Sequence, residues 1–350
     1  TPLYSSAASD VYKRQVVLIT GYAAGYVSAA MPRSGGGYVT ISRVIHPIVG
    51  YMGGWLMYLA EAFSYGLIGV DVMFAIMTFY GIAAAPQSLS LDPSMIFLGG
   101  IAIVWVFALL ALLGTKMYGR LLQVIFYIPL VITILFFAMW IGGAINPSAV
   151  ATGVQDALGA TPKTFVDTAV ATGMTQHITG FFDAFSYALP GAFWAYMGWY
   201  ATTFLAGEVK EANKKLPMVL LVSGLIIVVV YLLATSLSAI SALNVYSWTD
   251  PATGHTWNFF QAYGWLSNYK DTGLSVAQIA MRNVAIPNFQ EAWSTGIASF
   301  TARGFGLGWM SWLIAIGGVL WLMNDIPPFL LVASRTFFAM SFDRMMPEKF

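Results

Sequence analysis

The chain has 350 residues and a formal net charge of +1, and 58% of its residues are hydrophobic while only 9% are charged. Soluble proteins carry roughly 25% charged residues, so the composition excludes a soluble protein and indicates a polytopic membrane protein. The small net charge gives no indication of nucleic-acid binding, and the absence of cysteine excludes disulfides, thiol catalysis and cysteine-ligated metals.

Residues 1–14 (TPLYSSAASDVYKR) are polar, show no periodicity and run directly into an apolar segment. They lack the charged, apolar and small-residue order of a secretory signal. We expect them to be a disordered or non-native leader, followed by a single transmembrane domain over residues 15–350.

Seven apolar segments are long enough to cross a bilayer, which takes about 20 residues. The expected spans are 15–31, 49–82, 94–114, 120–144, 181–206, 216–243 and 309–340. The sequence therefore predicts an all-α protein. The connections 145–180 and 244–308 are expected to be long polar loops, the second with short surface helices.

The basic residues after the leader gather on one side of this arrangement. Ten of them lie there, mostly in short loops: Arg33, Arg43, Lys116, Arg120, Lys210, Lys214, Lys215, Arg335, Arg344 and Lys349. Because short cytoplasmic loops are enriched in Lys and Arg, this side is expected to be cytoplasmic. The chain then starts its first span outside a cell membrane and ends inside.

The segment 181–206 is apolar enough to span the membrane but contains Pro190, Gly191 and Gly198. Proline removes a backbone donor and glycine adds backbone freedom. A broken helix persists in lipid only where protein or a water-filled cavity satisfies the freed groups, and such breaks mark substrate sites in transporters. The alternative is a proline kink with ordinary small-residue packing.

Residues 31–55 (MPRSGGGYVTISRVIHPIVGYMGGW) place three consecutive glycines between a short span and a long one. The pattern predicts a flexible, re-entrant-like cytoplasmic loop carrying Arg33 and Arg43. A phosphate-cradling glycine loop is not favoured, because the strand–loop–helix context and the GKS/T and GxGxxG motifs are absent.

Four collinear motifs carry a family resemblance. PRSGGGYVTISRVIHPIVGYMGGW resembles the signature loop after the second helix of amino acid–polyamine–organocation (APC) permeases, and Gly114-Thr115-Lys116 is similar to their Gly-x-Lys between helices four and five. FWAYMGWYATTFLAGEVKEANKKLP resembles the broken sixth helix and its cytoplasmic loop. ASRTFFAMSFDRMMPEKF resembles the loop after the eighth helix. The resemblance covers about residues 16–350.

This resemblance implies a partial five-plus-five inverted-repeat, leucine-transporter-like fold, truncated to about helices two to eight of twelve. It implies a secondary active transporter of amino acids or related amines that works by alternating access. Na⁺ or H⁺ would be the coupling ion, with no other cofactor, no metal site and no enzymatic activity. The partners would be the small-molecule substrate and the lipid bilayer, and the oligomeric state is left open.

The resemblance also implies where the substrate binds. The unwound segment and its aromatic neighbours would hold it, through Phe193, Tyr196, Met197, Gly198, Trp199 and Tyr200. Tyr200 stands where some members carry Glu, which argues against a cationic amino acid. Glu61 and Tyr65 align with the cavity-facing side of the third helix, and Phe329 with a cavity-facing aromatic of the eighth.

Ionisable groups inside spans are costly and usually functional. Glu61 is a candidate proton carrier or a partner for a substrate amine; the alternative is a hydrogen bond that holds two helices together. Asn324 and Asp325 precede two prolines that leave carbonyls free, and they are candidates for holding a proton or cation. A cytoplasmic gate of ion pairs is expected from Arg33, Glu208, Lys210 and Arg335.

Two other classes of protein were weighed. A seven-helix receptor or retinal protein would carry a lysine in the last span or an Asp-Arg-Tyr-type triplet after the third, and neither 309–334 nor 114–120 contains one. A membrane-embedded enzyme would need clustered metal ligands or a nucleophile with its base. The three histidines, His46, His177 and His255, lie far apart in sequence.

Overall fold

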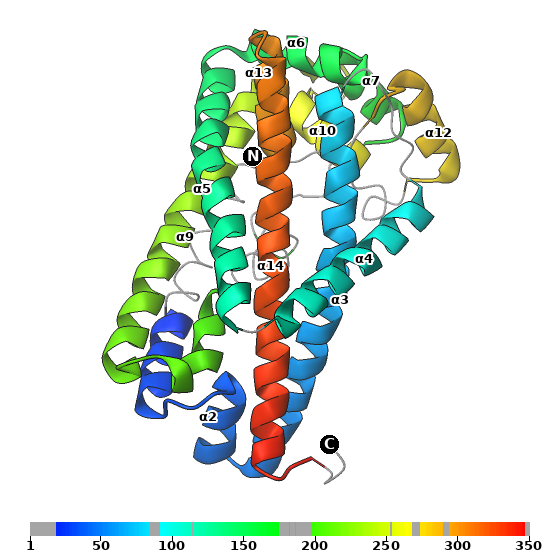
Figure 1. The fold of residues 1–350 in the computed structure, drawn as a ribbon. Helices are drawn as coiled ribbons and strands as arrows, with labels where there is room; N and C mark the ends of the chain where they lie inside the picture. The colour runs from blue at the N-terminus through cyan, green and yellow to red at the C-terminus, as the bar shows by residue number, and fades with distance from the viewer. Residues whose placement is uncertain are drawn as a thin grey trace. The chain divides into compact units, whose positions relative to one another are not determined.

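The computed structural model describes residues 19–84, 92–113, 115–174, 182, 186, 198–252, 254–267, 274–289 and 294–346. Residues 19–30 are helical. They are followed by these elements, shown in Figure 1: α2 (Gly36–Val44), α3 (Pro47–Ala84), α4 (Pro93–Leu112), α5 (Thr115–Ile145), α6 (Pro147–Leu158), α7 (Pro162–Ala171), the 3₁₀ helix η1 (Trp199–Glu208), α9 (Ala212–Leu243), β1 (Ser247–Thr249), β2 (Thr256–Asn258), α10 (Phe259–Ser267), α12 (Val276–Ala285), α13 (Ser294–Gly304) and α14 (Gly308–Phe342).

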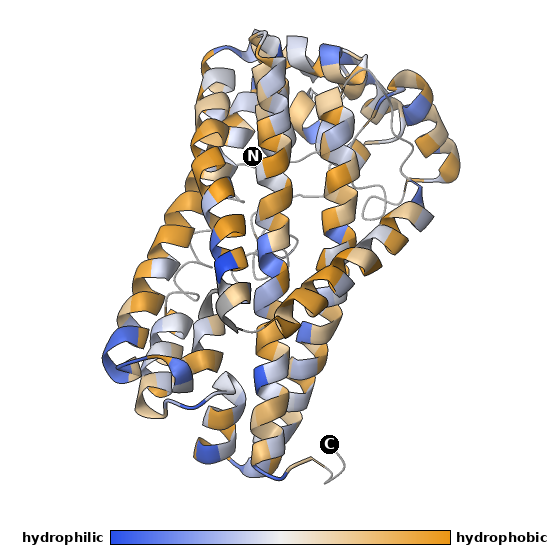
Figure 2. Cartoon of the chain, in the orientation of Figure 1, coloured by the Kyte–Doolittle hydropathy of each residue, from blue (hydrophilic) through white to orange (hydrophobic). Residues whose placement is uncertain are grey.

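Within this part of the chain, five helices are long and apolar enough to cross a membrane: α3, α4, α5, α9 and α14. Each covers one of the expected spans, and Figure 2 shows the runs of hydrophobic residues along them. The first expected span is helical over 19–30, and its residues 15–18 lie outside the described residues. Most of the fifth, 181–206, also lies outside them.

Helix α4 illustrates why these helices belong in lipid. Pro93 occupies its first turn, and the side chain of Asp92 accepts a hydrogen bond from the backbone N–H of Ser94 at 2.9 Å, which caps the helix. Only Gly100 and Phe107 of its 20 residues are buried. A helix that exposes an apolar surface on nearly every side is stable in hydrocarbon and not in water.

Two segments expected to be loops, 31–55 and 145–180, contain helices, and 244–308 contains the short helices expected of it. The glycine-rich segment 31–55 includes α2, the connection 145–180 includes α6 and α7, and 244–308 holds the β1–β2 hairpin with α10, α12 and α13. Residues Gly296 to Ala302 of α13 are all buried, so α13 is not a surface helix. Glycine acts here as a small packing residue: a Cβ on Gly153 of α6 would lie 1.7 Å from the carbonyl oxygen of Phe300 in α13.

The chain divides into two compact units, and α3, α9 and α14 contribute residues to both. The second unit (Ile68–Thr175 and Leu233–Asn324) has an apolar core in which Phe165 contacts Phe259 and Tyr263, with ring centroids 5.3 Å and 5.6 Å apart. At its rim, Arg303 pairs with Asp156 at 2.7 Å and donates to the carbonyls of Ile82 and Ala83. The guanidinium therefore caps the C-terminal end of α3.

Candidate functional site

The backbone at Gly198 departs from α-helical geometry. Its φ is 97° and its ψ is −32°, and it precedes the ten-residue 3₁₀ helix η1. Such a positive φ suits glycine, and 3₁₀ runs longer than three or four residues are uncommon and often mark a hinge. Among the described residues, no atom lies within 4 Å of where a Cβ on Gly198 would be. Non-helical glycine geometry thus occurs inside a sequence that is apolar enough to span a membrane.

The aromatic residues expected around this break are only partly described. Phe193, Tyr196 and Met197 lie outside the described residues, and of Trp199 and Tyr200 the structure describes the backbone, which begins η1. Gly198 is therefore the member of the expected substrate-binding segment whose surroundings are described.

Glu61 and Tyr65 lie one turn apart on α3, and both are buried, with exposed fractions of 7% and 9%. Residues four apart share one face of a helix. Across the described residues, Glu61 makes no hydrogen bond or ion pair. Because an ionised carboxylate is costly in apolar surroundings without a partner, this position suits a group that exchanges a proton or meets a ligand's amine.

Asp325 and Phe329 also lie one turn apart, on α14. Asp325 is exposed although it sits at the middle of a 35-residue apolar helix. Helix α14 continues through Pro327 and Pro328, whose missing N–H groups leave two carbonyls, including that of Asn324, without their helical donors. An accessible carboxylate next to free carbonyls is suited to holding a cation or proton.

Two of the four residues expected at the cytoplasmic gate make an ion pair. Arg335 of α14 and Glu208, the last residue of η1, lie with 2.6 Å between Nη2 and Oε1. Arg33 and Lys210 make no ion pair with any residue that the structure describes. A gating role for the four residues stays a prediction.

A second charged contact ties α2 to the end of α14 and was not among the predicted gate residues. The Asp343 carboxylate accepts hydrogen bonds from Arg43 Nη2 at 2.7 Å and from the Tyr38 hydroxyl at 2.9 Å. The hydrogen bond from Arg43 lowers the pKa of Asp343. Burial, followed by the hydrogen bond to Asp343, raises the pKa of Tyr38 to about 12. Tyr38, Arg43 and Asp343 all lie inside the family motifs quoted above. Their place in these motifs was the one feature of the sequence that could have pointed to this contact.

Close packing at Gly35 holds the same region together. Gly35 has a φ of 113°, and a Cβ there would lie 2.4 Å from the Cβ of Ala339 on α14. Its backbone N–H donates to the carbonyl of Phe204 in η1 at 3.2 Å. The glycine run is thus an ordered contact between the start of α2, η1 and α14, and not the flexible loop that was expected.

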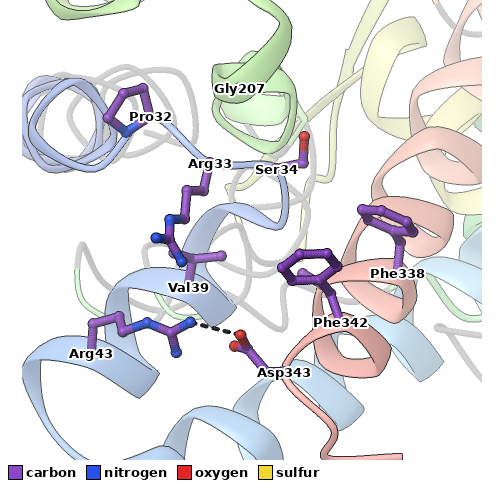
Figure 3. A pocket seen from close by; sticks show the side chains of 10 residues that line it. Pro32, Arg33, Ser34, Val39, Arg43, Gly207, Phe338, Phe342 and Asp343 are labelled. Atoms are coloured by element: carbon purple, nitrogen blue, oxygen red, sulfur yellow. Dashed lines mark hydrogen bonds and ion pairs between the residues drawn. The ribbon is translucent and has the colours of Figure 1, made fainter.

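These elements enclose a pocket of about 330 Å³ in the first unit. It is lined by Pro32, Arg33, Ser34, Val39, Arg43, Gly207, Phe338, Ala339, Phe342 and Asp343. Figure 3 shows Arg33 above Val39, the Arg43–Asp343 contact at one edge and the two phenyl rings of α14 at the other. The pocket combines basic, hydroxyl and aromatic groups.

The five apolar helices define a multi-pass, all-α membrane protein. A family model described as Amino acid permease matches residues 15–350, and the chain belongs to that family. The resemblance drawn from the four motifs is therefore confirmed. Membership of a family of transporters also favours transport over the receptor and enzyme alternatives.

Proposed function

We propose that the protein is a secondary active transporter that moves amino acids or related amines across the cell membrane by alternating access. The observation that carries the proposal is the interrupted backbone at Gly198, in a chain of the amino acid permease family. Backbone N–H and C=O groups freed at such a break bind the charged ends of a substrate near the middle of the bilayer.

In this proposal the substrate contacts the segment around Gly198 and residues of α3 and α14. The binding set is Phe193, Tyr196, Met197, Gly198, Trp199, Tyr200, Glu61, Tyr65 and Phe329. Glu61 carries the proton or meets the substrate's amine, and its burial supports this role. Asn324 and Asp325 hold the coupling H⁺ or Na⁺, supported by the two prolines that follow them.

The Glu208–Arg335 pair is proposed to favour the closed state of the inner gate. Both side chains are partly exposed, 47% and 29%, and such pairs contribute at most about 1 kcal/mol. The pair therefore biases the gate without locking it. The positive-inside distribution supports placing this end of the molecule in the cytoplasm.

Uptake by reconstituted protein tests the proposal. Liposomes containing the protein are given labelled amino acids or amines under an imposed pH gradient or Na⁺ gradient. At least one substrate is expected to accumulate under one of the gradients. Failure of every amino acid and amine to accumulate under either gradient contradicts gradient-driven transport.

The Glu61→Gln variant tests the coupling role. If Glu61 carries the proton, the variant is expected to abolish pH-driven uptake and to retain substrate binding, because glutamine keeps the shape and loses the proton. If Glu61 instead meets the substrate's amine, substrate binding is expected to weaken as well. Asp71→Asn is the matched control, since Asp71 is a carboxylate on the same helix and is exposed. Undiminished pH-driven uptake by Glu61→Gln removes Glu61 from the mechanism.

A further inference from the structure

The pocket that contains Arg33 lies at the ends of two candidate membrane-spanning helices. Its walls come from residues 32–34, from α2, from Gly207 and from the end of α14. The span α3 begins at Pro47, shortly after α2, and the span α14 ends at Phe342, which itself lines the pocket. Because the ends of spanning helices lie near the polar boundary of a bilayer, this pocket opens at that depth.

The pocket holds two cations and one carboxylate: Arg33, Arg43 and Asp343 all line it, and the charge of Arg33 also acts on Asp343. Arg43 is neutralised by Asp343, at 2.7 Å. Arg33 is exposed and makes no ion pair with the described residues, so the pocket carries a net positive charge beside the Ser34 hydroxyl. A planar guanidinium fork with a neighbouring hydroxyl matches the oxygens of a phosphate group.

The other side of the pocket is apolar and accessible. Phe338 and Phe342 line it with exposed fractions of 55% and 77%, and Val44 and Ile45 at the end of α2 are each 67% exposed. A ligand for this pocket therefore has an anionic group and an apolar part joined to it. A small free anion would leave the phenyl rings uncovered.

We propose that the pocket binds an anionic membrane phospholipid. Its phosphate lies at Arg33 and Ser34, and the start of an acyl chain covers Phe338 and Phe342. Basic pockets between transmembrane helices are suited to anionic headgroups, and the net positive charge favours these over zwitterionic ones. The recognition is by side chains, so it requires no glycine-loop phosphate cradle. It goes beyond the proposed transport activity and does not depend on it.

Native mass spectrometry of the purified protein in detergent tests this proposal, with phosphatidylglycerol and phosphatidylcholine of identical acyl chains as probes. Phosphatidylglycerol is expected to be retained in preference. Arg33→Gln is expected to weaken its binding about fivefold, the effect of one basic side chain near an anionic surface, and Arg33→Lys to retain most of it. Lys214→Gln, which removes an exposed cation outside the pocket, is the matched control and is expected to change nothing.

Phe342→Ser is expected to weaken phosphatidylglycerol binding too, since the apolar contact is lost. Thermal unfolding of each variant reports whether it is folded. The proposal is overturned if Arg33→Gln binds phosphatidylglycerol like the unsubstituted protein. It is also overturned if Arg33→Gln and Lys214→Gln lose the same amount of affinity for phosphatidylglycerol. Equal retention of phosphatidylcholine overturns it as well. Displacement of the lipid by an equal concentration of inorganic phosphate would show a free-anion site instead.

Discussion

Removal of the Asp343 carboxylate is expected to weaken the attachment of α2 to the end of α14. In Asp343→Ala, the hydrogen bonds from Arg43 and Tyr38 are both lost. A hydrogen bond to a charged group contributes about 1.5–3 kcal/mol, whereas an exposed ion pair contributes at most about 1 kcal/mol. The Asp343 side chain is 19% exposed and that of Arg43 is 37% exposed. The contribution of this contact to stability therefore lies between these limits. We expect Asp343→Ala to lower the free energy of unfolding by about 2 kcal/mol.

The free energy of unfolding, measured in detergent micelles for Asp343→Ala, Tyr38→Phe and the double variant, checks this value. A double-mutant cycle is expected to give a coupling of about 1 kcal/mol between the two side chains. The contribution of the Arg43–Asp343 ion pair to the free energy of unfolding should fall with added salt, because salt screens an exposed pair.

The pKa shifts set the pH range of this contact. The folded pKa of Asp343 is lowered, so its contribution is complete above the ordinary aspartate pKa near ~4 and is lost as the pH falls through the lowered value. The pKa of Tyr38 is raised to about 12. Its contribution is complete below the ordinary tyrosine pKa near ~10 and is lost as the pH rises through 12.

Asp167→Ala is the control. Asp167 also pairs with a basic side chain, Lys163 at 2.5 Å, but both side chains of that pair are more than half exposed. It is expected to change stability much less than Asp343→Ala. Equal losses in the two variants, or additive effects of Asp343→Ala and Tyr38→Phe, would refute the argument.

Three other substitutions follow from the packing and the ion pairs. Gly35→Ala should lower the melting temperature, because Gly35 has a φ of 113° and an added Cβ would clash with Ala339. Gly37→Ala should not, because no atom of the described residues lies within 4 Å of its Cβ position; equal melting temperatures would contradict this. Arg303→Gln should destabilise the fold, since it loses an ion pair and a helix cap, and unchanged denaturant unfolding would contradict it. Because the chain has no cysteine, access from the cytoplasmic side is measured at a single cysteine introduced beside the pair. Glu208→Gln should increase the labelling of that cysteine several-fold, through loss of about 1 kcal/mol of pairing with Arg335; unchanged labelling would contradict it.

The spanning helices were predictable because lipid imposes a simple requirement. A helix such as α4 must be apolar over about 20 residues, and that is visible in sequence without knowledge of its neighbours. The helices α2 and α6 were not predicted, since glycine and polar residues in short segments are equally compatible with loops. Short helices were expected between 244 and 308, but on the surface, and α13 is buried. Position 153 requires glycine because the backbone of Phe300 passes too close for a Cβ, and this contact depends on the tertiary structure.

The site was predictable to the extent that it depends on local backbone chemistry. Gly198 stood out as a break within an apolar segment, and the structure gives it a positive φ. The Arg43–Asp343 pair joins residues 300 positions apart, and no local pattern reveals which of several arginines meets which carboxylate. For the same reason the sequence did not show that Arg33 lines a pocket together with Arg43 and Asp343.

Amino acid binding to the Gly198→Ala variant tests the central claim most directly. Among the described residues, the added methyl meets no atom within 4 Å, so the substitution acts on the backbone conformation and on the space left for a ligand. Gly264→Ala, which also has open space but no positive φ, serves as the control. The account predicts that Gly198→Ala loses at least about tenfold in affinity, or about 1.4 kcal/mol, while Gly264→Ala binds normally. Equal affinities for the two variants would contradict a substrate site at the Gly198 backbone.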